Sequence, residues 1–256
     1  MRRWTGSSAV LGVLVLVLTA CGGAVGTGAA PSAPSPSAGA VTSPSPIPTG
    51  PNVSGCFTEA DGKIIKHAHG MPAVIAGDGP VGVVITYERR GTVCSWRPLS
   101  DRLVAAGYRV LLYVRDSAML PEDTTIALAR RLAKEKGVER VFLVGGSIGA
   151  TTAVPAALKL GSEAAGVVAG VVALSGQIKP EQAARLTVPL LQIGSENDGY
   201  GGADDLAAAQ AAATKAAANE TMVIPGESLH ASALFSSPHG PAVLDRIVTF
   251  LDRHKG

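Results

Sequence analysis

The apolar and polar residues of this chain alternate in two periods from about Met71 to the C-terminus. Continuous apolar runs of about four to eight residues are typical of strands that are buried on both faces. They predict strands over residues 72–76, 81–87, 109–114, 141–144, 167–174, 188–193 and 221–224. Apolar residues at helical spacing lie between these runs, and they predict helices over residues 98–106, 121–136, 148–160, 204–218 and 242–253.

This alternation indicates an α/β fold, in which helices cover both faces of a mostly parallel sheet. Such sheets bind ligands beyond the carboxyl ends of their strands, so we expect the functional residues there. Residues 57–69 precede the alternating part and predict an antiparallel addition that turns at Asp61-Gly62. Pro155 lies inside the predicted helix 148–160, where it should kink the helix or end its first segment.

The first residues of the chain have the pattern of a targeting segment. A basic start, Arg2-Arg3, is followed by an almost unbroken apolar run over residues 9–20, which is too short for a stable transmembrane helix. The run ends in Leu18-Thr19-Ala20-Cys21, which resembles the lipobox of bacterial lipoproteins. The resemblance implies cleavage before Cys21 and fatty acyl chains such as palmitate on that cysteine. The alternative is an ordinary secretory signal in which Cys21 is incidental.

The segment 22–52 contains no charged residue and is rich in Gly, Ala, Ser, Thr and Pro. Such a composition cannot bury enough apolar surface to fold, so we expect a tether that is partly flexible and partly extended. The organisation that follows is a signal peptide over residues 1–20, a lipidated cysteine with its tether over 21–52, and a folded domain over 53–256. We therefore expect the protein on the extracytoplasmic face of the cell membrane.

The charge balance of the chain gives no support for nucleic acid as a partner. The formal net charge is +2, and Arg2 and Arg3 supply that surplus. No Cys/His cluster has zinc-site spacing and no glycine-rich loop has the phosphate-binding form, so we expect neither a metal nor a cofactor. Export favours a disulfide between Cys56 and Cys94 over two buried free thiols.

The sequence Gly145-Gly146-Ser147-Ile148-Gly149 follows the apolar run 141–144 and opens the predicted helix 148–160. A G-x-S-x-G pattern between a strand and a helix is typical of a nucleophile elbow, which presents the serine hydroxyl above the sheet. A serine hydroxyl is a poor nucleophile at neutral pH, and it needs a base and a group that orients this base. Ser147 is therefore our candidate nucleophile.

In elbow-type sites the acid and then the histidine follow the serine along the chain. Asp198 comes after the predicted strand 188–193 and is our candidate acid, with Glu196 in reserve, although Asn197-Asp198-Gly199 also has the composition of a simple turn. His230 follows the last predicted strand and is our candidate base. A loop histidine is often only solvated polar surface, and His239 is a competing candidate.

An oxyanion requires two backbone N–H donors. Ile148, directly after the serine, is expected to supply one. The second is expected from the loop after strand 81–87, where we choose Arg89, with Glu88 as the other candidate. Arg90 is expected to be solvated surface. Cys94 belongs to the same loop, so a disulfide to Cys56 would stiffen it.

The region from about Val81 to the C-terminus resembles a small α/β-hydrolase, similar to dienelactone-hydrolase-like and esterase-like members with little or no cap domain. It differs from many members in having Tyr87-Glu88 where they carry His-Gly. The matching pieces are Val83-Val84-Ile85-Thr86-Tyr87, Cys94-Ser95-Trp96, residues 105–111, 145–150 and 195–199, and His230. The resemblance implies an α/β-hydrolase domain over residues 53–256 with a Ser147–His230–Asp198 triad.

Together these features predict a membrane-tethered serine hydrolase that cleaves an ester or related acyl bond of a small-molecule substrate. One alternative is an acyltransferase that uses the same triad. The other is a catalytically inactive hydrolase fold that serves as a surface binding module. The order of Ser147, Asp198 and His230 argues against the inactive module, and the altered oxyanion loop argues for it.

Overall fold

The computed structural model describes residues 49–163 and 166–256, which belong to one compact unit, Pro46–Gly256. The expected signal peptide, Cys21 and nearly all of the tether lie outside the described residues. Within the described ranges, no helix combines the length and apolar character needed to cross a membrane. The elements in chain order are β1 (Asn52–Val53), β2 (Phe57–Thr58), β3 (Lys63–Lys66), η1 (Ala68–Gly70), β4 (Pro72–Ala76), β5 (Val81–Thr86), η2 (Val93–Trp96), α1 (Arg97–Ala105), β6 (Arg109–Tyr113), α2 (Pro121–Ala133), β7 (Arg140–Gly146), α3 (Ile148–Glu163), β8 (Val168–Leu174), α4 (Pro180–Ala183), β9 (Leu190–Ser195), α5 (Ala203–Ala212), β10 (Asn219–Ile224), η3 (Ala231–Ser236) and α6 (Gly240–His254).

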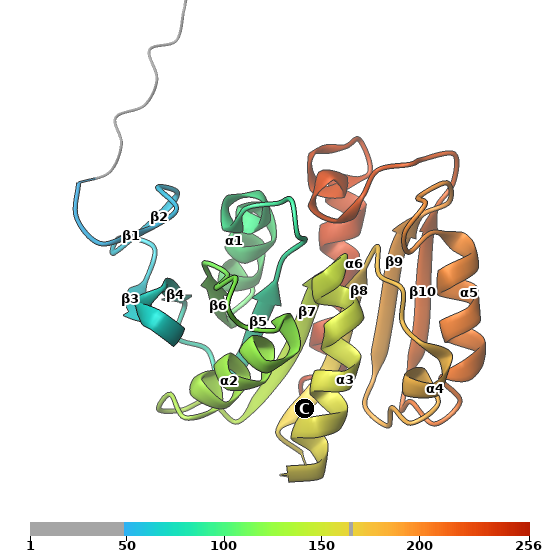
Figure 1. Ribbon diagram of the computed structural model, residues 1–256, viewed down its shortest axis with the longest axis horizontal. Coiled ribbons are helices and arrows are strands. Elements are labelled where there is room, and N and C mark those ends of the chain that lie inside the picture. Colours follow the sequence, from blue (N-terminus) through green and yellow to red (C-terminus); the bar gives the residue numbers. More distant parts are fainter. Residues whose placement is uncertain (1–48, 164–165) are drawn as a thin grey trace, which may run out of the picture. The chain divides into compact units, whose positions relative to one another are not determined.

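Eight of the strands form one sheet in the order β10-β9-β8-β7-β5-β6-β4-β3 (Figure 1). The strands from β10 to β6 are parallel, whereas β4 is antiparallel to β6 and β3 is antiparallel to β4. The mostly parallel α/β sheet is therefore confirmed, with a short antiparallel edge. The only helix between β8 and β9 is α4, so no sizeable cap domain is inserted there.

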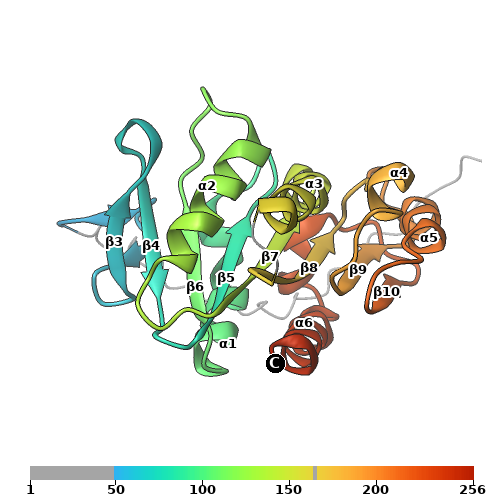
Figure 2. The same ribbon diagram turned by 90° about the horizontal axis from the view of Figure 1, so that it is seen from below.

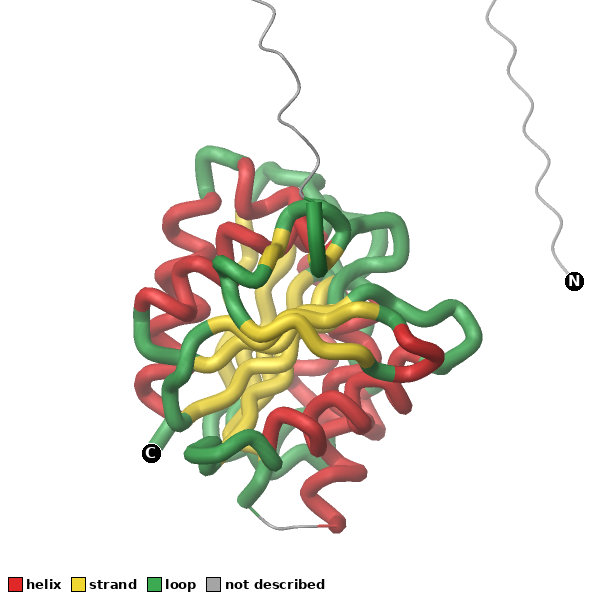
Figure 3. Tube along the Cα trace, turned by 90° about the vertical axis from the view of Figure 1, so that its left-hand side faces the viewer, coloured by secondary structure: helices red, strands yellow, loops and turns green. Residues whose placement is uncertain are grey.

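Helices cover both faces of the sheet, with α2 and α3 on one side and α1 and α6 on the other (Figure 2). Figure 3 looks from the β3 edge and shows the strands fanning into a twisted sheet between the two helical layers. Alternate residues of β5 point to opposite layers: Val83 and Ile85 belong to the core beneath α1 and α6, and Val84 to the core beneath α2 and α3. Burial on both faces explains why the central strands are continuous apolar runs.

The N-terminal addition is antiparallel as expected, and the chain turns at residues 59–62, but β2 and β3 on either side of this turn do not pair with each other. β1 and β2 form a separate two-stranded sheet, and β3 instead turns through η1 to pair with β4. Asp61 closes a local turn, since its carboxylate accepts hydrogen bonds from the backbone N–H of Thr58 at 2.8 Å and from the Thr58 hydroxyl at 3.2 Å. Aspartates commonly close turns through such local hydrogen bonds, which do not require the flanking strands to pair.

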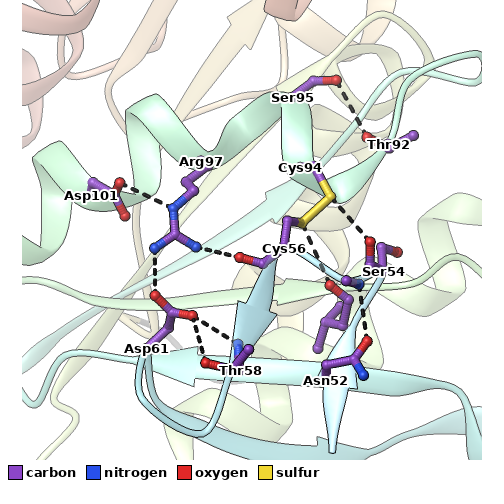
Figure 4. The surroundings of a disulfide bond; sticks show 12 residues. Asn52, Ser54, Cys56, Thr58, Asp61, Thr92, Cys94, Ser95, Arg97 and Asp101 are labelled. Carbon is purple, nitrogen blue, oxygen red and sulfur yellow. Dashed lines mark hydrogen bonds and ion pairs between the residues drawn. A yellow bond between two sulfur atoms is a disulfide. The ribbon is translucent and has the colours of Figure 1, made fainter. Parts of the chain in front are cut away.

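The disulfide between Cys56 and Cys94 is present in the structure, as expected (Figure 4). Arg97, at the start of α1, donates a hydrogen bond to the carbonyl oxygen of Cys56 and pairs with Asp61 at 2.5 Å. Its guanidinium also lies 4.9 Å from the centre of the Phe57 ring. The disulfide and Arg97 together attach the β1–β2 segment to the loop between β5 and α1.

Pro155 does not end the helix that contains it, because α3 continues from Ile148 to Glu163. Proline in a helix interior typically costs about 3 kcal/mol. The helix is packed between α2 and strands β7 and β8, and it buries Ala153, Val154 and Ala156 beside the proline. Tertiary packing therefore outweighs the local penalty.

Candidate active site

Ser147 occupies a sharp turn between β7 and α3. Its φ is +54°, a left-handed conformation that costs a non-glycine residue on the order of 1 kcal/mol or more. The turn needs glycine on both sides: a Cβ on Gly145 would overlap the backbone of Gly149, and a Cβ on Gly149 would overlap the carbonyl oxygen of Thr86. The backbone N–H of Ser147 donates to the carbonyl oxygen of Leu174 at 2.8 Å. This hydrogen bond fixes the elbow to the carboxyl end of β8.

His230 and Asp198 are joined by a hydrogen bond between His230 Nδ1 and Asp198 Oδ2 at 2.7 Å. The second carboxylate oxygen of Asp198 accepts the backbone N–H of Tyr200 at 3.1 Å. The Asp198 side chain is 7% exposed and that of His230 is 36% exposed. Because Nδ1 faces a carboxylate, we assign the ring proton to Nδ1, which leaves Nε2 as the proton acceptor.

The two reserve candidates make other contacts. Glu196 accepts a hydrogen bond from the backbone N–H of Gly226 at 2.7 Å, and His239 lies 3.5 Å from Glu227. Neither is hydrogen-bonded to a residue of the His230–Asp198 pair. The structure thus joins Asp198, and not Glu196, to the candidate base.

Ser147 and His230 line one cavity of about 510 Å³. Its lining residues are Glu88, Arg89, Arg90, Ser147, Tyr200 and His230. Within the described ranges, the Ser147 hydroxyl has no hydrogen-bond partner, and no group of three or more His, Cys, Asp or Glu side chains is arranged to hold a metal ion. Hydrogen bonds between a nucleophile and its base are often absent until substrate binds.

The two expected oxyanion donors lie at the ends of neighbouring strands. Ile148 is the first residue of α3, where a backbone N–H has no acceptor within the helix and the helix dipole favours negative charge. Arg89 follows β5, which pairs in parallel with β7, and its backbone N–H has no acceptor among the described residues. Both N–H groups are therefore available to a ligand atom.

Glu88, the other sequence candidate for a donor, has a different place in the site. Its carboxylate accepts a hydrogen bond from Trp96 Nε1 at 2.7 Å and another from the Ser232 hydroxyl. A Cβ on Gly91 would overlap this carboxylate, so the turn that carries Arg89 and Arg90 closes tightly around it. Glu88 thereby connects the loop after β5 to η2 and to η3, which begins directly after His230.

Two buried serines that sequence reasoning missed hold the backbone on either side of His230. The Ser195 hydroxyl, at the end of β9, donates to the carbonyl oxygen of Leu229 at 2.6 Å. The Ser175 hydroxyl, just after β8, accepts the backbone N–H of Ala231 at 2.9 Å. Both serines are fully buried, and Ala231 has a φ of +48°. The sequence signal for them is a hydroxyl at the end of an apolar strand, which is too common to identify a site.

Tyr200 is a further residue that the sequence did not single out. Its hydroxyl lies 3.0 Å from the Thr151 hydroxyl on α3, and its ring centre is 6.1 Å from that of His230. The tyrosine therefore forms a wall of the cavity between the elbow helix and the histidine loop.

No protein-family model and no curated protein matches the chain. Solved structures do. The chain is similar to the esterase Pf2001 of Pyrococcus furiosus, with 14% identity, 80% of this chain and 97% of that one covered, and a TM-score of 0.64. It is also similar to Est1E of Butyrivibrio proteoclasticus, with 12% identity, 75% of this chain and 98% of that one covered, and a TM-score of 0.61. A third similar structure is a putative dienelactone hydrolase of Klebsiella pneumoniae, with 19% identity, 73% of this chain and 95% of that one covered, and a TM-score of 0.56. At these identities the likeness concerns the backbone, and it shows that this chain has the α/β-hydrolase fold.

Proposed function

We propose that the protein is a serine hydrolase that cleaves an ester, or a related acyl bond, of a small-molecule substrate. The observation that carries the proposal is the elbow serine at positive φ, which shares a cavity with a histidine that is itself hydrogen-bonded to a buried carboxylate. The esterases among the solved structures that share the fold support the same chemistry.

In the first half of the reaction, the Ser147 oxygen attacks the acyl carbon while His230 Nε2 takes the hydroxyl proton. Asp198 holds the imidazole through Nδ1 and stabilises the charge that develops on it. The backbone N–H groups of Ile148 and Arg89 donate to the oxyanion. Each such donor typically contributes about 3 kcal/mol to the transition state. The bond between the acyl carbon and the leaving oxygen then breaks, and His230 gives its proton to the leaving alcohol.

In the second half, a water molecule attacks the acyl group on Ser147 and gives a proton to His230. The ester bond to Ser147 breaks, the proton returns to the serine oxygen, and the carboxylic acid leaves. The absence of a cap between β8 and β9 leaves the cavity without a covering domain on that side, which suits entry of water and of a small or surface-presented substrate.

The proposed enzyme is held on the extracytoplasmic face of the cell membrane by lipid on Cys21, with residues 22–52 as a tether. The support for this part is the lipobox-like sequence before Cys21 and the uncharged composition after it. A single acyl chain binds a membrane only weakly, and two or more give stable anchoring.

The test replaces Ser147 by alanine. Ser147→Ala should abolish hydrolysis of p-nitrophenyl esters and labelling by a fluorophosphonate probe, with an unchanged circular dichroism spectrum. Ser162→Ala, at an exposed position of the same helix, is the matched control and should keep both signals. Hydrolysis by Ser147→Ala at the rate of the unaltered protein would contradict the assignment of the nucleophile.

The same assay separates the remaining alternatives. An unaltered, folded protein that neither reacts with the probe nor hydrolyses any ester would be the inactive binding module. A product that is mainly a new ester when an alcohol is added, and little free acid, would identify an acyltransferase.

A further inference from the structure

Two arginines form one side of the candidate active-site cavity. Arg89 and Arg90 follow Glu88 in the loop after β5, both are exposed, and both line the cavity that contains Ser147 and His230. Besides the backbone role expected of Arg89, both side chains lie at the edge of the candidate site, and Arg90 is exposed as expected.

Neither guanidinium group has a hydrogen-bond or ion-pair partner among the described residues. Most other arginines of the described part are engaged, for example Arg97 with Asp61, Arg102 with Asp245 and Arg130 with Glu163. Arg185 is also unpaired, but it lies away from this cavity. Two adjacent unpaired arginines are therefore unusual among the arginines of the described part, and these two lie beside the candidate nucleophile.

The one carboxylate that lines the cavity forms no ion pair with either arginine, and the two positive charges outnumber its single negative charge. Both oxygens of Glu88 already accept hydrogen bonds, one from Trp96 and one from Ser232. Asp198 is directed to His230 and to the backbone of Tyr200. The cations consequently remain available to a ligand.

The surface of the cavity is mainly apolar, as in most small-molecule sites, so the two arginines supply its charged part. A guanidinium offers several N–H donors in a planar fork that matches the two oxygens of a carboxylate. The pair therefore suits a substrate that carries a carboxylate.

We propose that Arg89 and Arg90 form an anion-binding subsite, and that the natural substrate is an ester that carries a carboxylate near the scissile bond. This inference rests on the proposed serine hydrolase function and names the substrate class of that site. The carboxylate belongs either to the acyl half, as in a half-ester of a dicarboxylic acid, or to the alcohol half.

The experiment compares matched substrates. For the acyl half, the pair is p-nitrophenyl hydrogen adipate and p-nitrophenyl hexanoate, which share a leaving group and an acyl chain length. For the alcohol half, the pair is 4-(hexanoyloxy)benzoate and its methyl ester. The value of kcat/KM is measured for each, with spontaneous hydrolysis subtracted by means of Ser147→Ala. We expect the unaltered protein to prefer the anionic member of at least one pair.

The double variant Arg89→Gln/Arg90→Gln should reduce that preference by about tenfold, mainly through a higher KM for the anionic ester. Arg185→Gln makes the same charge change away from the cavity and should leave the preference unchanged. Added salt should weaken the preference in the unaltered protein and have little effect on the neutral ester, because exposed charges are screened.

The outcomes distinguish this inference from the proposed function. Hydrolysis of the neutral esters with no preference in either pair, or a preference that survives the double variant, would overturn the anion subsite and leave the hydrolase intact. Failure to hydrolyse any of the four esters, together with no labelling by the fluorophosphonate probe, would overturn both.

Discussion

At the scale of single residues, the site depends on which polar groups share a hydrogen bond. Asp198 and Glu196 follow the same strand within one short loop, yet only Asp198 meets the imidazole of His230. Serine hydroxyls then fix the loop that carries this histidine: Ser195 binds the backbone before it and Ser175 the backbone after it.

Replacing the acid tests its role. Asp198→Asn should lower kcat by roughly 10⁴-fold with little change in the fold, because an amide no longer holds the imidazole in the tautomer that accepts the serine proton. Glu196→Gln is the control, and it should keep most of the activity since its side chain binds only the backbone of Gly226. Steady-state kinetics on a p-nitrophenyl ester measures both. Greater damage from Glu196→Gln would show that the acid is wrongly assigned.

Ser175 is a positioning residue in this account. Ser175→Ala should lower kcat about tenfold to a hundredfold with a smaller effect on KM. It should also cost about 1–3 kcal/mol of unfolding free energy, because the buried N–H of Ala231 loses its acceptor. Ser175→Gly is the comparison, since glycine removes the hydroxyl but relieves the φ of +48° at this position. If the glycine variant keeps full kcat, backbone strain and not the hydroxyl explains the alanine result.

At the scale of elements, buried Val53 and Phe57 and a few specific links, and not extended strand pairing, attach the N-terminal segment to the rest of the domain. β1 and β2 pair only with each other in register, and the disulfide and the contacts of Arg97 connect this segment to α1 and its preceding loop (Figure 4). The disulfide spans 38 residues and reaches the loop that follows Glu88. The same links therefore stiffen the loop that carries Arg89 and Arg90.

The Arg97–Asp61 pair gives this attachment a pH dependence. The hydrogen bond from Arg97 holds the pKa of Asp61 below its ordinary value of 3.8. A carboxyl whose pKa is lowered by folding contributes stability above its unfolded pKa, and this contribution is lost as the pH falls through the lower, folded value.

Asp61→Asn should therefore cost about 1 kcal/mol of unfolding free energy at pH 7, and its stability should approach that of the unaltered protein in strong acid. Asp101→Asn is the control, because Asp101 also contacts Arg97 but is far more exposed. Urea unfolding at several pH values measures the difference. An equal loss for Asp61→Asn at all pH values would attribute its effect to the hydrogen bonds with Thr58 and not to charge.

At the scale of the whole molecule, the mostly parallel sheet brings the ends of β5, β7, β8, β9 and β10 to one edge. The elbow serine, the acid, the histidine and the arginine pair all follow these ends. Cys21, which we expect to carry the lipid anchor, precedes the described residues. The anchor is therefore tested by finding where variants of the protein are located in the cell.

Cys21→Ser should release the protein from the membrane or leave it uncleaved, because serine cannot form the thioether to which the lipid is attached. Fractionation of membranes and mass spectrometry of the N-terminus measure the two outcomes. Ser147→Ala is the control, and it should stay with the membrane fraction. A Cys21→Ser protein that is cleaved after Ala20 and remains membrane-bound would contradict the lipid anchor.

The sequence by itself determined the fold class and the order of the chemistry along the chain. Apolar runs such as 141–144 and 167–174 are unmistakable because both faces of a parallel strand are buried. The elbow is equally local, since its glycines and Ser147 must satisfy a turn within five successive residues. The disulfide was predictable because the expected export and a single remaining pair of cysteines left few choices.

Only the tertiary structure decided how the ends of the strands meet. The hydrogen bond from the Ala231 N–H to the Ser175 hydroxyl joins residues 56 positions apart, and the one from the Ser232 hydroxyl to Glu88 joins residues 144 positions apart. No local pattern encodes such pairs, because a buried hydroxyl or carboxylate takes whichever partner the packing brings within hydrogen-bond distance. For the same reason the sequence favours Asp198 and keeps Glu196 in reserve, and only the contacts of the loop after β9 show which carboxylate meets His230.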